Sequence, residues 1–246
     1  KSNKAPIVVS IGNTTTTVYP QAGEGGANVT TDAYIGPNAP QNSDWATIRT
    51  TTSNLIQDGV NGTNPYADII ATATTDQWSR LFRPIFTFDT SGIDDADVVS
   101  AAVLSLRGTA KADGCSITPT IDIYQFKTSG NNNLVTTSDY NTGQGSTSQT
   151  GSAMTYANYS TAGFNDFTFD ATGRGNIVAT GTSPFSVRNA NYDVSGTAPT
   201  WSSGCNSGFT GRYADFADTT SDPVLVVTHA VAVAGAKVVS PLLLFE

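Results

Sequence analysis

The chain has 246 residues, of which only 13% are charged, and its formal net charge at pH 7 is −8. Its 12 Lys and Arg residues are scattered, whereas nucleic-acid phosphates and anionic membrane surfaces attract concentrated basic patches. The composition therefore argues against both as partners. No run approaches the roughly 18 apolar residues of a membrane-spanning helix, because polar residues and glycine interrupt the closest one, residues 224–239.

Thr, Ser, Asn and Gly supply most of the polar surface, and they favour strands and turns over helices. The length fits one all-β domain of about 200 residues with extensions. The composition is typical of proteins exposed outside cells, and the first residue, Lys1, indicates a processed chain or a fragment. Cys115 and Cys205 agree with that location if they form a disulfide, and the alternative is two free buried thiols.

The N-terminal unit, residues 1–29, begins with a polar lead that contains Lys1 and Lys4. A compact apolar strand over 5–10, a β-prone run over 14–19 and a Gly-rich connector over 21–26 follow. The main domain then opens with further elements. We expect a strand at 31–35, a loop at 36–43, a strand at 45–50, a turn-rich loop at 58–65 and a strand at 67–73.

Residues 81–107 predict two strands joined by a tight acidic turn, a hairpin around which the other strands assemble. Phe86 and Phe88 alternate with Thr87, as in a half-buried strand. The second strand, 98–106, has apolar residues on both faces and is expected to be central and covered. In that strand, Val98 is expected on the same face as Leu104.

The remaining elements follow from the same patterns. We expect strands at 118–127, 164–170, around Phe185 and Val187, and at 224–228, with a loop at 189–209 and a helical turn at 173–178. Residues 129–152 are expected to form a long surface loop with one helical turn near 137–140. Its only core positions would be Leu134 and Val135.

Five runs of this sequence together resemble the DNRLRE domain group: DAYI at 32–35, RPIFTFDTSGI at 83–93, AAVLSL at 101–106, FTFDAT at 167–172 and DPVLVVT at 222–228. That group comprises extracellular β-sandwiches of bacteria, archaea and their viruses, close in style to carbohydrate-binding modules. The resemblance covers roughly residues 30–229, and the hexapeptide that names the group is absent.

The resemblance implies a jelly-roll sandwich, often one module of a larger cell-surface, adhesive or viral structural protein. It implies no catalytic residues, although relatives of this style often hold a structural Ca²⁺. We therefore expect a single jelly-roll-like β-sandwich over residues 30–229. Residues 1–29 and 230–246 would add terminal strands to it.

Catalytic signals are weak, and we expect no enzyme activity. The single histidine, His229, follows a strand of Val and Leu, and no G-x-S-x-G motif accompanies it, so a packed or surface histidine is the simpler interpretation. One His and two Cys argue against a zinc site. Paired carboxylates for glycoside hydrolysis stay open, but Glu24, Asp68 and Asp139 lie in no recognisable motif.

Three kinds of binding or modification site remain as candidates. Asp32, Asp94 and Asp95 offer hard oxygen ligands for calcium, against the alternative of solvated turns. Trp45 and Trp201 are candidate stacking platforms for a glycan, against the alternative of core anchors. Four Asn residues begin N-x-S/T sequons, and Asn61 and Asn158, in expected loops, are the best candidates for glycosylation.

Assembly is the hypothesis that we favour, because both ends of the chain are apolar. Burial of each such side chain contributes roughly 1.5–3 kcal/mol, so the ends should pack on their own sheet or on a neighbouring copy. The candidate assembly residues are Ile7, Val8, Val9, Val238, Val239, Leu242, Leu243, Leu244 and Phe245. In β-augmentation, such a strand completes a neighbour's sheet. The expected function is an extracellular, cell-surface or virion-surface structural or adhesive subunit that forms a filament or layer. The alternative is a carbohydrate-binding module.

Overall fold

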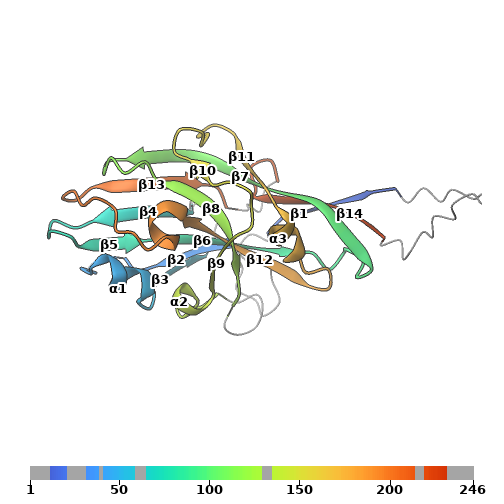
Figure 1. Cartoon of the computed structure of the whole chain (residues 1–246), viewed down its shortest axis with the longest axis horizontal. Helices are drawn as coiled ribbons and strands as arrows, with labels where there is room; N and C mark the ends of the chain where they lie inside the picture. The colour runs from blue at the N-terminus through green and yellow to red at the C-terminus, as the bar shows by residue number, and fades with distance from the viewer. Residues whose placement is uncertain are drawn as a thin grey trace, which may run out of the picture.

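The computed structural model describes residues 12–20, 32–38, 41–58, 65–128, 135–213 and 219–231. These residues form two antiparallel sheets that pack face to face (Figure 1), so the expected all-β sandwich is confirmed. Its jelly-roll form stays a prediction. The candidate assembly strands, the Gly-rich connector and Asn61 lie outside the described residues.

The first sheet is built around its longest strand, β7. In spatial order its strands are β1 (Thr14–Val18), β14 (Val224–Val231), β7 (Asp97–Asp113), β13 (Asn206–Gly211), β4 (Tyr66–Ala71) and β5 (Trp78–Leu81), and β11 (Phe164–Thr168) pairs with β7 off this path. β1 is rich in Thr, whose branched Cβ favours extended backbone, and it pairs with β14 from Thr14↔His229 to Val18↔Leu225.

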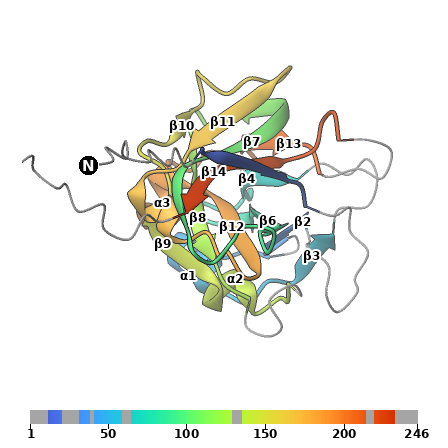
Figure 2. The same cartoon turned by 90° about the vertical axis from the view of Figure 1, so that its right-hand side faces the viewer.

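The second sheet lies beneath the first in Figure 2. In spatial order its strands are β10 (Met154–Thr155), β8 (Thr120–Phe126), β12 (Thr182–Asn189), β6 (Arg83–Asp89), β2 (Asp32–Gly36) and β3 (Leu55–Asp58), and β9 (Gln144–Ser148) pairs with β8. Alternate residues of both sheets meet in the core, where Phe88, Leu104, Phe185 and Leu225 are almost completely buried. This burial follows from the period-two patterning of the strands.

Short helices lie at the ends of the sandwich and on the outer face of the second sheet. They are α1 (Trp45–Thr50), α2 (Asp139–Thr142), α3 (Ala171–Gly175) and a π-helix, η1 (Ala190–Val194). The strand expected at 45–50 was therefore wrong. Asp44 caps α1 by accepting a hydrogen bond from the Thr47 amide at 2.8 Å, and Trp45 and Ile48, one helical turn apart, face the core.

The central hairpin expected over 81–107 is also wrong, because its two strands belong to different sheets. β6 pairs with β2 and β12, whereas β7 pairs with β11, β13 and β14. The connection between them crosses from one sheet to the other and inserts Ile93 into the core. The strand over 98–106 was expected to be covered on both faces, but β7 has an exposed outer face. The strand that is buried on both faces is β6.

The loop expected over 129–152 is partly ordered structure. Its described part, from residue 135, contains α2 and β9, and Tyr140 is completely buried although no core position was expected there. The hydroxyl of Tyr140 donates to the Ile48 carbonyl at 2.9 Å. Composition alone had favoured a loop because Ser, Thr, Asn and Gly surround this tyrosine.

A buried ion cluster holds the helices on the outer face of the second sheet. The carboxylate of Asp193 is completely buried and accepts two hydrogen bonds each from Arg83, at 2.6 and 2.8 Å, and from Arg188, at 2.9 Å. Arg83 also donates to the Tyr140 and Arg49 carbonyls. Burial alone would raise the pKa of Asp193, but the two guanidinium groups hold it well below its usual range.

The disulfide between Cys115 and Cys205 is formed, and the alternative of two free buried thiols was wrong. It joins the chain after β7 to the residue before β13, across 90 residues of sequence. Because β7 and β13 also pair directly, the disulfide lies just beyond the end of their hydrogen-bonded pairing at Asp113 and Ser207. In the chain-entropy account, a loop this long gives a disulfide a stabilising effect of about 4.5 kcal/mol.

Replacing Asp193 with Asn should destabilise the fold by about 3–5 kcal/mol, because two buried guanidinium groups would lose their countercharge. Urea unfolding at pH 7 measures this loss, and Asp94→Asn, at an exposed turn, is the control. Since the pKa of Asp193 is lowered in the folded state, its contribution is complete above about pH 4 and falls as the pH drops. A loss below about 1 kcal/mol would contradict the structural role of the cluster.

Asp68, on β4, has the opposite pH dependence. Its burial raises its pKa to about 6, although Arg80 donates to it at 3.2 Å and lowers the pKa in part. The folded state therefore binds the proton more tightly than the unfolded state, in which the pKa is 3.8. This contribution to stability is complete below pH 3.8 and is lost as the pH rises through about 6.

Asp68→Asn should remove that pH dependence. The free energy of unfolding of the variant, minus that of the original chain, should increase between about pH 4 and pH 6 by up to about 3 kcal/mol. Urea titrations at several pH values measure the difference, and Asp95→Asn, at an exposed turn position, is the matched control. A difference that does not vary with pH would contradict the assignment.

Candidate functional site

The first and last described strands leave the sandwich at the same end. Thr14 pairs with His229, and Val231 pairs with Asp97, so the start of β1, the end of β14 and the start of β7 lie side by side. These residues, 14–16, 97–99 and 229–231, form a projection that we name the terminal ribbon (Figures 1 and 2). Segments 1–11 and 232–246 attach to the described chain here.

Two apolar side chains on the terminal ribbon are exposed. Val98 is 58% and Val231 is 52% exposed, the highest values among the described large hydrophobic residues. The expectation that Val98 shares the face of Leu104 was wrong, because an extra residue at Ser100 shifts the register between β7 and β14. This bulge turns Val98 outward and Val99 toward the core.

A polar cluster links the three strands of the terminal ribbon to one another. Nε2 of His229 lies 2.8 Å from Oγ1 of Thr16, and Nδ1 lies 2.5 Å from Oδ2 of Asp97. The three residues come from β14, β1 and β7, and we name them the histidine clamp. All three side chains face inward because they lie on the core side of their strands.

The clamp has the order of groups that activates a hydroxyl nucleophile in hydrolases: hydroxyl, imidazole and carboxylate. Catalysis would also require a substrate to reach the hydroxyl. His229 is only 4% exposed, and none of the three residues lines either of the two larger grooves described below. The geometry therefore fits a structural link between strands better than a reaction centre. No sequence pattern could have shown it, because its members are distant along the chain.

The aromatic candidates for glycan stacking differ in exposure. Trp45 is 4% exposed and packs edge to face against Trp78, with ring centroids 5.3 Å apart. The expectation that Trp45 offers a stacking face was therefore wrong. Trp201 is half-buried against the second core cluster, which includes the disulfide.

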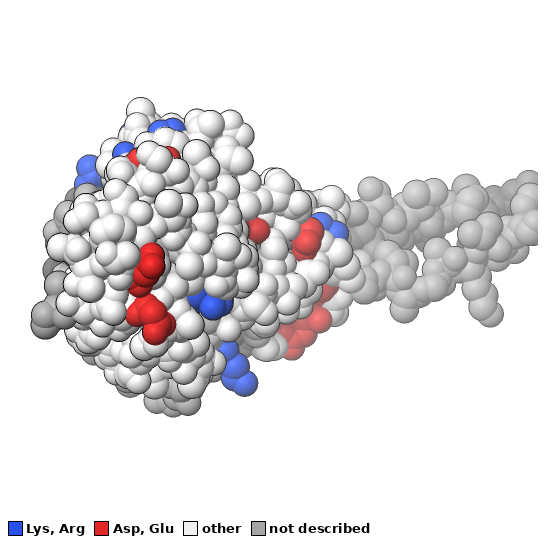
Figure 3. Space-filling model, turned by 60° about the vertical axis from the view of Figure 1, so that its left-hand side comes forward, with Lys and Arg blue, Asp and Glu red and all other residues white. Residues whose placement is uncertain are grey.

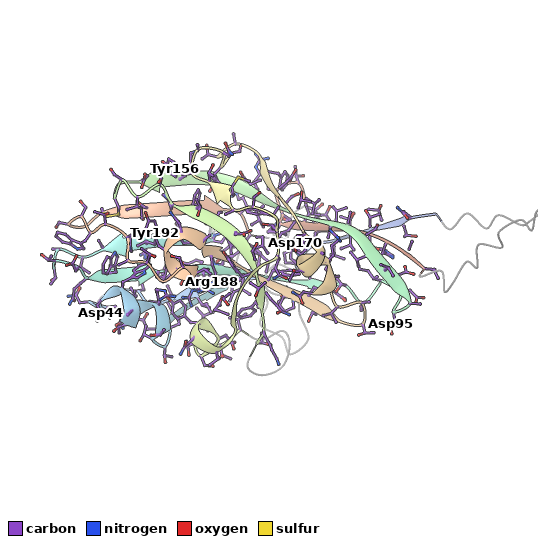
Figure 4. The ribbon with its side chains drawn as sticks, in the orientation of Figure 1. Asp44, Asp95, Tyr156, Asp170, Arg188 and Tyr192 are labelled. Atoms are coloured by element: carbon purple, nitrogen blue, oxygen red, sulfur yellow. A yellow bond between two sulfur atoms is a disulfide. The ribbon has the colours of Figure 1, made fainter. Side chains whose placement is uncertain are left out.

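The acidic candidates for calcium do not form one site. Asp32 is completely buried in β2, whereas Asp94 and Asp95 are exposed in the turn between β6 and β7, where Figure 4 labels Asp95. Within residues 12–20, 32–38, 41–58, 65–128, 135–213 and 219–231, no three His, Cys, Asp or Glu residues are grouped as metal ligands.

Two grooves open on the surface of the sandwich. A groove of 380 Å³ lies between β10 and β11, and the exposed sequon residue Asn158 lies on its rim. A second groove, of 290 Å³, is bordered by Lys127, Asn176 and Pro184. Neither groove was expected from the sequence. The first lies between strands of different sheets, and the second is lined by segments that are far apart in the sequence. On the face of the molecule that Figure 3 presents, charged residues are few and scattered.

Comparison with known proteins found no protein-family model and no curated protein that matches the chain. The described helices are all too short to cross a membrane.

Replacing Thr16 with Val should loosen β1 without unfolding the sandwich, because it leaves Nε2 of His229 without its partner at a cost of about 1–3 kcal/mol. Hydrogen exchange should therefore accelerate at the β1 amides by about tenfold or more, with little change in β12. Thr15→Val, on the exposed face of the same strand, is the matched control. Equal exchange rates in both variants would contradict the role of the clamp.

Proposed function

We propose that this chain is an extracellular structural or adhesive subunit that self-assembles through its terminal β-strands into a filament or a surface layer. The observation that carries the proposal is the terminal ribbon. There the first and last described strands leave the sandwich together, and Val98 and Val231 are the most exposed large apolar side chains among the described residues.

The edges of the first sheet support assembly by strand addition. Within the described residues, β1 pairs only with β14, so its outer edge has backbone groups without a strand partner. Such an edge is a template for a strand from another chain, whose main-chain hydrogen bonds supply affinity and whose side chains set the register.

The composition of the terminal segments supports the same proposal. Residues 5–9 and 238–245 are largely apolar, and transfer of such side chains from water to a neighbouring copy is favourable. If the segment of one copy binds a different surface of the next, the contact is heterologous and its repetition forms a filament unless it closes into a ring.

Two features support an extracellular location. The disulfide between Cys115 and Cys205 is typical of oxidising compartments. The surface is rich in Thr, Ser and Asn and poor in charge, and the resemblance to extracellular DNRLRE domains points the same way. Carbohydrate binding has less support, because Trp45 is buried and only the half-buried Trp201 remains as a stacking candidate.

The assembly proposal predicts that the full chain forms particles larger than a monomer and that charged terminal substitutions prevent this. The variants are Ile7→Asp with Val9→Asp, and Leu243→Asp with Phe245→Asp. At least one pair should shift the sedimentation profile to monomer, because a carboxylate opposes burial of the strand. Negative-stain microscopy would show whether the native particles are rods, rings or sheets.

The control is Val178→Asp, which places one carboxylate at an exposed apolar position outside the terminal ribbon. Circular dichroism should show the same fold in every variant. A native chain that is monomeric at all concentrations would overturn the proposal, and so would terminal variants that assemble as the native chain does.

A further inference from the structure

The groove between β10 and β11 lies where the edges of both sheets meet, and we name it the edge groove. β10 pairs only with β8, and β11 only with β7, among the described strands. Each strand therefore has an edge without a strand partner. The residues that line the groove are Thr150, Gly151, Ser152, Ala153, Met154, Asn158, Asp166, Phe167, Thr168, Phe169 and Asp170.

Hydrogen bonds fix both ends of the edge groove. At one end Thr150 forms a bridge with Phe169, and the Asp170 amide donates to the Gln149 carbonyl at 3.0 Å. At the other end the ammonium group of Lys111 donates to the carbonyls of Tyr156, at 2.6 Å, and Tyr159, at 2.9 Å. Tyr156 and Asp170 are labelled in Figure 4. The groove is therefore preformed.

The lining combines an apolar floor with acidic groups. Phe167 and Phe169 are buried beneath the groove, and Met154, a flexible side chain that adapts to different partners, is half-buried in it. Asp166 is exposed and accepts a hydrogen bond from Ser105 at 2.6 Å. The carboxylates of Asp166 and Asp170 line the groove. The nearby cations Lys111 and Arg174 lie outside its lining and donate to backbone carbonyls of Tyr156, Tyr159 and Phe169. The lining itself therefore favours a segment that is both apolar and basic.

We infer that the edge groove binds the N-terminal segment of a second copy, with Ile7 to Val9 over the apolar floor and Lys4 beside Asp166. This inference rests on the proposed function, because it names the surface that receives the exchanged strand. The C-terminal segment fits less well, since it ends in Glu246 and the terminal carboxylate, which Asp166 and Asp170 would repel.

The direction of β1 favours a second copy over the chain's own groove. β1 runs from the terminal ribbon into the sandwich, so the residues before Thr14 start at the projecting end. The edge groove lies farther back, where Thr168 pairs with Val103 of β7. An extended segment of 11 residues spans about 36 Å, and this length is enough to reach another molecule. To reach the groove of its own molecule, the segment would have to reverse its direction.

Filling the edge groove should therefore weaken assembly of the full chain. A Cβ at Gly151 would meet no atom within 4 Å, so Gly151→Trp can fill the groove without a backbone clash. Gly175→Trp is the control, at an equally open position outside the groove. The concentration at which half of the chain assembles should rise at least tenfold for Gly151→Trp and stay unchanged for Gly175→Trp.

Charge exchange tests the basic part of the segment. Asp166→Lys and Lys4→Asp should each weaken assembly, and the double variant should restore it, because the attraction re-forms with opposite sign. If the double variant assembles no better than the single variants, Lys4 does not lie beside Asp166, and the proposed placement of the segment is overturned.

Disulfide trapping identifies the segment and the copy it comes from. The two native cysteines are bonded to each other, so each variant adds one reactive thiol. A mixture of Ser152→Cys and Val8→Cys chains should form a mixed disulfide dimer, in higher yield than a mixture of Ser152→Cys and Leu243→Cys. Equal yields, or a higher yield with Leu243→Cys, would overturn the assignment of the N-terminal segment.

The outcomes separate this inference from the proposed function. If the native chain does not assemble, the proposed function fails and the inference fails with it. If the native chain assembles, Gly151→Trp assembles equally well and no mixed disulfide forms, only the edge groove is overturned as the receiving surface.

Discussion

One strand, β7, lies at the centre of the first sheet and pairs directly with three of its six other strands. Along its 17 residues it pairs with β14, β11 and β13, which come from the last third of the chain. The terminal ribbon, the edge groove and the disulfide all lie along β7 or next to its partners. A one-residue change in its register would move every inward side chain to the opposite face. The two register shifts along β7, at Ser100 opposite β14 and near Thr109 opposite β13, are therefore local adjustments of the ladder.

The outer face of the second sheet depends on electrostatics as much as on apolar contacts. Arg83 is on β6, Arg188 is on β12, and both bind Asp193 of η1. α1 and α2 are bound to the same cluster through the backbone carbonyls of Arg49 and Tyr140. Such short helices are marginal in isolation. Charge-assisted hydrogen bonds therefore determine where they pack.

Local periodicity predicted most strands of this chain, but it could not predict which strands pair. The residue patterns of 164–170 and 224–228 predicted strands, and the structure has β11 and β14 there. Such predictions succeed because side chains alternate between the two faces of a strand in any sheet, whichever strands it pairs with. Two strands joined by a short polar connection have the same periodicity whether they form a hairpin or lie in different sheets. The burial of Ile93 in the connection between β6 and β7 distinguishes the two cases only once the structure is known. For α1, the β-branched residues of 45–50 predicted a strand, whereas the structure shows a helix that Asp44 caps and that turns Trp45 and Ile48 to the core.

The candidate sites were less predictable than the strands for the same reason. The histidine clamp joins residues 16, 97 and 229, and the edge groove lies between strands of two sheets. No pattern within one segment encodes such proximity. Disulfide pairing was the exception, because two cysteines allow only one intramolecular bond.

The antiparallel pairing of β1 and β14 also determines how the subunit responds to mechanical force. If tension is applied to both ends of one molecule, the two strands are pulled apart from the same end, so their hydrogen bonds break one after another rather than all at once. The first bonds under tension are those around Thr14 and His229, and the clamp lies at this position. The single histidine of the chain thus reinforces the point at which peeling would begin.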